Sequence, residues 1–112
     1  MSRDESLYLL DIKEGCEKVL KFTAGMTLID FLHNDLHYDA VLRNLEIIGE
    51  AIKHISDAQR QKYTQVKWRK ISGFRDIVAH HYFGVSNEIV WDIIENEIPT
   101  LLKQVEVMVS KE

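Results

Sequence analysis

The chain has 112 residues, of which 46% are hydrophobic, and its formal net charge is −4. This length fits a single domain over residues 1–112. We expect neither a membrane span nor a signal peptide, because no apolar run reaches ~18 residues and the first five residues are largely charged. The single cysteine, Cys16, excludes an internal disulfide and favours a reducing cytoplasm.

Helical periodicity runs along the whole chain and predicts four main helices with short extra turns between them. The first helix is expected over residues 3–23, where Cys16 falls on the apolar stripe as a small core residue. Thr27-Leu-Ile-Asp30 resembles a capping box and predicts a short helical turn through Leu32. The pattern therefore predicts an all-α protein, a four-helix up-down bundle with short extra turns.

Two histidines follow this turn four residues apart, His33 and His37, with Asp35 and Asp39 nearby. Histidines at that spacing can bind zinc when they lie on one helix. The segment lacks the glutamate base that HExxH sites place between the two histidines. An exposed polar start of the second helix is therefore the preferred interpretation, and whether these histidines bind any metal stays open.

The second helix, expected over residues 38–55, is the most apolar and should be central to the fold. Gly49 inside it costs roughly 1 kcal/mol relative to alanine, which indicates close approach of another helix. Arg43, Glu46 and Glu50 share one face. They form either an exposed stripe of ion pairs or a polar set that supports a catalytic site.

The second half of the chain predicts two more helices. Ser56 should cap a short turn through Tyr63, and Thr64 should cap a third helix over residues 66–82. A fourth helix should begin at Ser86 or Asn87. Within it, Pro99 should cause a kink near Asn96, because proline removes a backbone donor.

Residues 58–75 contain no acidic residue but six basic ones, so this segment is +6 and the remainder −10. Basic residues interleaved with Tyr63, Trp68 and Phe74 are typical of an RNA-binding surface. The candidate RNA contacts are Lys67, Arg69 and Lys70. The alternative is a solvated helix end whose aromatic side chains belong to the core.

The residues that indicate chemistry follow this basic segment, and they are Arg75, Asp76, His80 and Tyr82. Asp76 lies one helical turn before His80 and could orient its imidazole. His80 could then take the proton of a 2′-hydroxyl, and Arg75 could stabilise charge on the phosphate in the transition state. This set is suited to phosphodiester cleavage without a metal or another cofactor.

The spacing of these residues also suggests an assembly. Arg75 and His80 are five residues apart, so their side chains diverge by about 140° on one helix. Either the helix ends near His80, or a working site combines residues from two copies of the chain. We therefore expect a homodimer in which both copies of the motif face a shared cleft.

The pattern Arg75-Asp-Ile-Val-Ala-His80-His-Tyr82 resembles the signature of the HepT toxins, in the HEPN superfamily of ribonucleases. The resemblance covers nearly the whole chain and includes Arg43-Asn-Leu-Glu-Ile-Ile-Gly-Glu-Ala51, Trp68-Arg69 and Val90-Trp91. Asp76 departs from the family pattern, in which asparagine is the commonest residue at this position.

The resemblance implies the toxin of a type VII toxin–antitoxin system, a metal-independent endoribonuclease acting on tRNA or other RNA, with no DNA partner. It also implies a hetero-oligomer with an MntA-type nucleotidyltransferase antitoxin, which would transfer AMP to Tyr82. Arg75 and His80 would be catalytic, and Asp76 would support them. The alternative is a non-catalytic helical module that binds such a nucleotidyltransferase or RNA through the same face.

Overall fold

The computed structural model describes residues 4–74, 76 and 87–111. All regular secondary structure in this part of the chain is helical, which confirms the all-α prediction. The elements in chain order are α1 (Glu5–Thr23), α2 (Leu28–Leu32), α3 (Asp35–Ile52), α4 (Asp57–Lys62), α5 (Trp68–Ser72), α7 (Asn87–Asp92), the π-helix η1 (Ile93–Glu97) and α8 (Ile98–Ser110).

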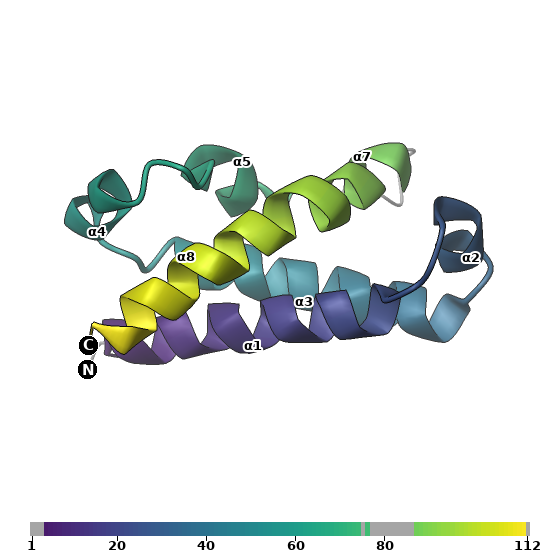
Figure 1. Cartoon of the computed structure of the whole chain (residues 1–112), viewed down its shortest axis with the longest axis horizontal. Coiled ribbons are helices and arrows are strands. Elements are labelled where there is room, and N and C mark those ends of the chain that lie inside the picture. The colour runs from purple at the N-terminus through teal and green to yellow at the C-terminus, as the bar shows by residue number, and fades with distance from the viewer. Residues whose placement is uncertain (1–3, 75, 77–86, 112) are drawn as a thin grey trace.

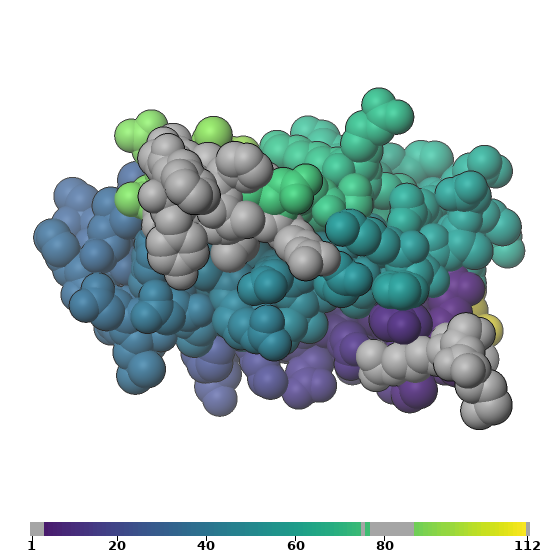
Figure 2. All heavy atoms as spheres, turned by 180° about the vertical axis from the view of Figure 1, so that it is seen from behind, coloured from purple at the N-terminus to yellow at the C-terminus, as the bar shows by residue number. Residues whose placement is uncertain are grey.

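The framework consists of the three long helices α1, α3 and α8. Helix α1 packs along both α3 and α8, and it runs opposite in direction to each of them (Figure 1). Helices α4 and α5 lie along one side of this framework. In the view from behind, α3 crosses the middle of the molecule, with α1 below it and α4 and α5 beside it (Figure 2).

The core forms where the apolar stripes of these helices meet. Cys16, Ile48 and Leu101 have no exposed surface, and each comes from a different long helix. Burial away from water raises the pKa of the Cys16 thiol, and the nearby Glu17 carboxylate adds to the shift. Cys16 is therefore a core residue, as its place on the apolar stripe predicts.

Gly15 lies where α1 packs tightly against α3. A Cβ atom at this position would lie 2.8 Å from Ile48 Cγ1 and 3.2 Å from Ile48 Cδ1. Ile48 is fully buried, so its side chain has little room to move away. The glycine is needed here because a larger residue on α1 would push the two helices apart.

We predict that Gly15→Ala lowers the free energy of unfolding by about 1–2 kcal/mol. The added methyl group overpacks the core at a cost of about 1–3 kcal/mol, which outweighs a gain of about 1 kcal/mol in helix propensity. Urea denaturation of purified protein measures the change. In an Ile48→Ala background the methyl group has space, so Gly15→Ala should there be neutral or stabilising. Equal destabilisation in both backgrounds would contradict the contact.

The helix starts agree with the capping residues of the sequence. Thr27 and Asp30 form a reciprocal capping box, in which Thr27 Oγ1 accepts from the Asp30 amide at 3.2 Å and Asp30 Oδ2 accepts from the Thr27 amide at 3.1 Å. Ser56 caps α4, as predicted. Helix α3 begins three residues earlier than predicted, because Asn34 accepts a hydrogen bond from the His37 amide and caps it there.

The third predicted helix starts differently in the structure. Thr64 does not cap it, since α5 begins at Trp68 with Lys67 at the N-cap position and no side-chain cap. The helix is also interrupted, because Gly73 lies in a turn after Ser72. Residues 75 and 77–82 of the predicted range 66–82 lie outside the described residues, so the four-helix bundle stays a prediction.

The C-terminal segment contains a π-helix around Asn96, the residue near which Pro99 predicts a kink, and the kink itself stays a prediction. A wide π-turn, η1, covers Ile93–Glu97, and the Ile98 amide donates to the Ile93 carbonyl, five residues back. Pro99 occupies the first turn of α8, where its missing N–H does least harm. The π-turn places Glu97 in a buried position.

No helix in the described part of the chain is both long and apolar enough to span a bilayer.

Candidate functional site

Arg75, His80 and Tyr82 lie outside the described residues, and so does the proposed geometry between them. Asp76 is described, and its side chain is exposed. On either side of the motif the chain is attached to the framework. Phe74 is 1% exposed in the core, and Asn87 Oδ1 accepts a hydrogen bond from the Tyr38 hydroxyl at 2.7 Å. The motif is therefore connected at both ends to fixed points of the fold.

The basic segment before the motif is held by side-chain hydrogen bonds to the backbone. Arg60 Nη2 donates to the Ile52 carbonyl at 2.6 Å. The indole N–H of Trp68 donates to the carbonyls of Tyr63 at 3.0 Å and Arg60 at 3.1 Å. Trp68 and Phe74 are buried, so the core explains these two aromatic residues and neither is available for base stacking.

Two of the three candidate RNA contacts form ion pairs with the C-terminal segment. Lys67 Nζ lies 3.6 Å and Lys70 Nζ 3.3 Å from Glu97 Oε1. Lys70 Nζ also lies 3.6 Å from Asp92 Oδ2. Both lysines are therefore paired with carboxylates of the fold, while their side chains stay 67% and 40% exposed. We call Lys67, Lys70, Asp92 and Glu97 the ionic cluster.

Arg69 differs from the two lysines on either side of it. All three residues are exposed, but among the described residues no carboxylate forms an ion pair with Arg69. Its guanidinium is therefore more accessible to an external anion than either ammonium group. A planar group with five N–H donors also fits a phosphate better than an ammonium does.

Sequence reasoning missed the role of Glu97. The signal was present, because Glu97 lies three residues after Ile94 and four before Leu101, two apolar residues that are both buried in the structure. A carboxylate at such a position must be buried, and a buried carboxylate needs a cationic partner. The acid-free segment of residues 58–75 was the obvious source of that partner.

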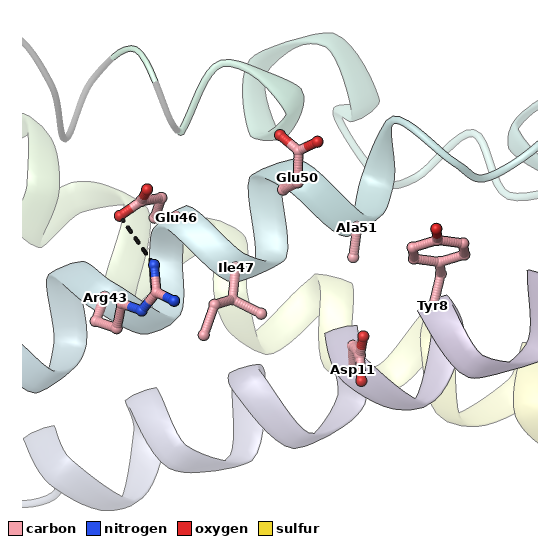
Figure 3. A pocket seen from close by; sticks show the side chains of 7 residues that line it. All are labelled: Tyr8, Asp11, Arg43, Glu46, Ile47, Glu50 and Ala51. Carbon is pink, nitrogen blue, oxygen red and sulfur yellow. Dashed lines mark ion pairs between the residues drawn. The ribbon is translucent and has the colours of Figure 1, made fainter. Parts of the chain in front are cut away.

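The polar face of α3 borders a cleft of about 350 Å³ between α1 and α3. Tyr8 and Asp11 of α1 line it from one side, opposite α3 residues that include Arg43 and Glu50 (Figure 3). Arg43 Nη1 lies 3.5 Å from Glu46 Oε2 at one end of this cleft. These contacts fit the interpretation of an exposed stripe of ion pairs. Support of Arg75 and His80 by the same residues stays a prediction.

Tyr8 and His54 form a stacked pair that the sequence does not reveal. Their ring centroids are 4.2 Å apart and their planes differ by 8°. Glu50 Oε1 lies 3.9 Å from His54 Nε2. The pair links the first turn of α1 to the turn that follows α3, and because the residues are 46 positions apart in the sequence, no local pattern predicts it.

The structure assigns a structural role to one of the two histidines considered for zinc. His37 Nδ1 lies 2.9 Å from the Phe22 carbonyl oxygen, and a neutral or protonated ring can donate its proton there. His33 is exposed. Within residues 4–74, 76 and 87–111, no group of three or more His, Cys, Asp or Glu side chains is arranged to hold a metal ion.

Comparison with known proteins identifies the family of the chain, which the geometry of the described residues alone does not. A family model described as "Ribonuclease HepT-like" matches residues 12–108. The chain is 39% identical over 108 residues to "Putative RNase MJ0127" of Methanocaldococcus jannaschii, covering 96% of this chain and 89% of the relative. It is 41% identical over 105 residues to "Putative RNase TTE0752" of Caldanaerobacter subterraneus subsp. tengcongensis, covering 94% of each.

A third relative is "Probable ribonuclease HepT" of Thermococcus cleftensis, which is 38% identical over 101 residues, or 90% of this chain and 92% of the relative. No solved structure matches the chain at a significant level. The family match includes every residue of the motif and of the basic segment. The chain therefore belongs to the HepT-like ribonuclease family.

Proposed function

We propose that this protein is the toxin of a type VII HepT/MntA-type toxin–antitoxin system and acts as a metal-independent endoribonuclease. The observation that supports this most strongly is the family match over residues 12–108, which includes Arg75, His80 and Tyr82. The relatives carry the descriptions "Putative RNase" and "Probable ribonuclease HepT". RNA is the proposed substrate, with tRNA the first substrate to test.

In this mechanism His80 is the general acid–base and Arg75 binds the scissile phosphate. His80 takes the proton of the 2′-hydroxyl as its oxygen attacks the adjacent phosphorus, and the bond to the 5′-oxygen breaks. Arg75 stabilises the negative charge that develops on the phosphate oxygens. Asp76, which is exposed and four residues before His80 in the sequence, accepts the imidazole N–H and fixes its orientation.

We propose that an MntA-type nucleotidyltransferase antitoxin controls this activity by transferring AMP to Tyr82. The support is the pattern Arg75-x4-His80-x-Tyr82, which places the phenol seven residues from the phosphate-binding arginine. On a regular helix residues seven apart lie on one stripe, so a phosphodiester on Tyr82 would compete with RNA for Arg75.

The proposal is tested by RNA cleavage with purified protein in excess chelator. A bulk tRNA preparation and an unstructured RNA oligonucleotide are the two substrates, and product ends are identified by mass spectrometry. Products ending in a 2′,3′-cyclic phosphate, formed in chelator, would support the proposed reaction. Binding of RNA without cleavage under all conditions would instead support the non-catalytic binding module.

We further predict a homodimer in solution. The five-residue interval between Arg75 and His80 separates their side chains by about 140° on one helix, so two copies can complete a site that one copy cannot. Light scattering at micromolar concentration measures the mass of the assembly. A monomer that is fully active in RNA cleavage at the same concentration would contradict the shared site.

A further inference from the structure

The ionic cluster joins two segments of the chain that are distant in sequence. Its centre is Glu97, whose side chain is 9% exposed and lies on the core-facing side of η1. A carboxylate this deeply buried loses most of its hydration, so the two lysine ammonium groups at 3.3 and 3.6 Å are needed to compensate its charge. Removing either partner would leave a buried charge poorly compensated.

The second carboxylate of the cluster restrains the same segment. Asp92 Oδ2 contacts Lys70 Nζ, while Asp92 Oδ1 accepts a hydrogen bond from Asn96 Nδ2 at 2.6 Å. Lys70 is therefore held between one residue from α7 and one from η1. These contacts fix the first turn of α5, five residues before Arg75.

The geometry of α5 separates Arg69 from this cluster. Lys67 and Lys70 are three residues apart and lie about 60° apart around the helix, on the side facing η1. Arg69 lies about 160° from Lys67 and about 100° from Lys70. It therefore points away from Glu97, in agreement with the ion pairs that the two lysines form there.

We propose that the ionic cluster is a clamp that positions the segment leading into the motif, and that Arg69 is the residue of this segment that binds RNA phosphate. Lys67 and Lys70 are positioning residues. This inference rests on the proposed ribonuclease function, since it names the contact through which the same protein holds its substrate.

The proposal predicts how the affinity for RNA depends on salt concentration. A lysine whose charge is already compensated by a carboxylate of the protein releases no counterion when RNA arrives, whereas a free arginine does. Each phosphate neutralised on a single strand contributes about −0.7 to the slope of log K against log salt concentration. The slope therefore reports which cations meet phosphate, independently of how stable the fold is.

The experiment measures binding of a fluorescein-labelled single-stranded RNA at several salt concentrations, in a His80→Ala background that prevents turnover. Arg69→Gln should make the slope shallower by about 0.7, while Lys67→Gln and Lys70→Gln should leave it unchanged. Glu97→Gln keeps the size of the side chain but releases Lys67, whose long side chain is 67% exposed and can then reach phosphate, so the slope should become steeper by about 0.7. A merely structural role for Glu97 would not steepen it.

Thermal unfolding without RNA tests the clamp separately. Lys70→Gln and Glu97→Gln should each lower Tm by several degrees, and the double variant should lower it by less than the sum, because both remove the same interaction. Arg69→Gln is the matched control and should leave Tm unchanged. Additive losses for Lys70 and Glu97 would overturn the clamp.

The RNA-binding measurement distinguishes failure of the proposed ribonuclease function from failure of the roles assigned to Arg69 and the two lysines. Wild-type protein that fails to bind or cleave RNA even at low salt would overturn the proposed function, and with it the role of Arg69. Wild-type protein that binds RNA, but whose slope falls as much in Lys67→Gln and Lys70→Gln as in Arg69→Gln, would overturn this inference and leave the ribonuclease function standing.

Discussion

Replacing His80 with alanine should lower the rate of RNA cleavage by about 10²–10⁴, the usual contribution of a positioned general acid–base. Affinity for RNA should change little, because a catalytic base contributes mainly to the transition state. Single-turnover cleavage in excess chelator, together with an RNA-binding titration, measures both quantities. The loss should therefore appear in the rate constant and leave the dissociation constant within a few-fold of wild type.

His33→Ala is the matched control, since it removes an exposed histidine that belongs to no described metal group. It should cleave RNA at the wild-type rate. Equal cleavage by wild type and His80→Ala would show that His80 is not the acid–base. A rate that falls in both variants would point to a general effect of losing histidines and not to the motif.

Tyr82→Phe should abolish covalent silencing while leaving the protein folded and able to cleave RNA. Phenylalanine keeps the ring but lacks the oxygen that would attack the α-phosphorus of ATP and displace pyrophosphate. Without that oxygen no phosphodiester can form to compete with RNA for Arg75. The measurement is intact mass after incubation with the candidate antitoxin, ATP and Mg²⁺, followed by cleavage of RNA.

Tyr63→Phe supplies the matched control, because Tyr63 is a half-buried tyrosine outside the motif. It should still gain the mass of AMP and lose its activity. An AMP-sized increase that persists in Tyr82→Phe would show that another residue accepts the nucleotide. Silencing of Tyr82→Phe without any gain in mass would show that the antitoxin acts by binding alone.

The fold follows from the sequence wherever the signal is local. Thr27 with Asp30, and Ser56 with its downstream amide, begin helices as predicted, because a capping side chain and its target lie within four residues. The predicted cap at Thr64 is wrong because the start of α5 depends on contacts between residues that are further apart in the sequence. The indole of Trp68 bonds back to the carbonyls of Arg60 and Tyr63, and these contacts set the path of the chain before the helix can start.

The sequence also predicts some features of the candidate site and not others. The motif and the basic segment can be recognised in the sequence because the residue types and their spacing identify them. What the sequence did not predict is that Lys67 and Lys70 face a carboxylate 27 to 30 residues away, since that pairing depends on how α5 lies against η1. A charge count over residues 58–75 therefore overstates the cationic surface that RNA can meet.

The buried thiol of Cys16 is a natural probe of unfolding. Its surface is fully covered and its raised pKa disfavours the thiolate, so an alkylating reagent can react only when the helices around it separate. Labelling kinetics of this one sulfur therefore measure the free energy of opening directly, without an introduced probe. An inactive variant that labels as slowly as wild type has lost chemistry, whereas one that labels quickly has lost its core.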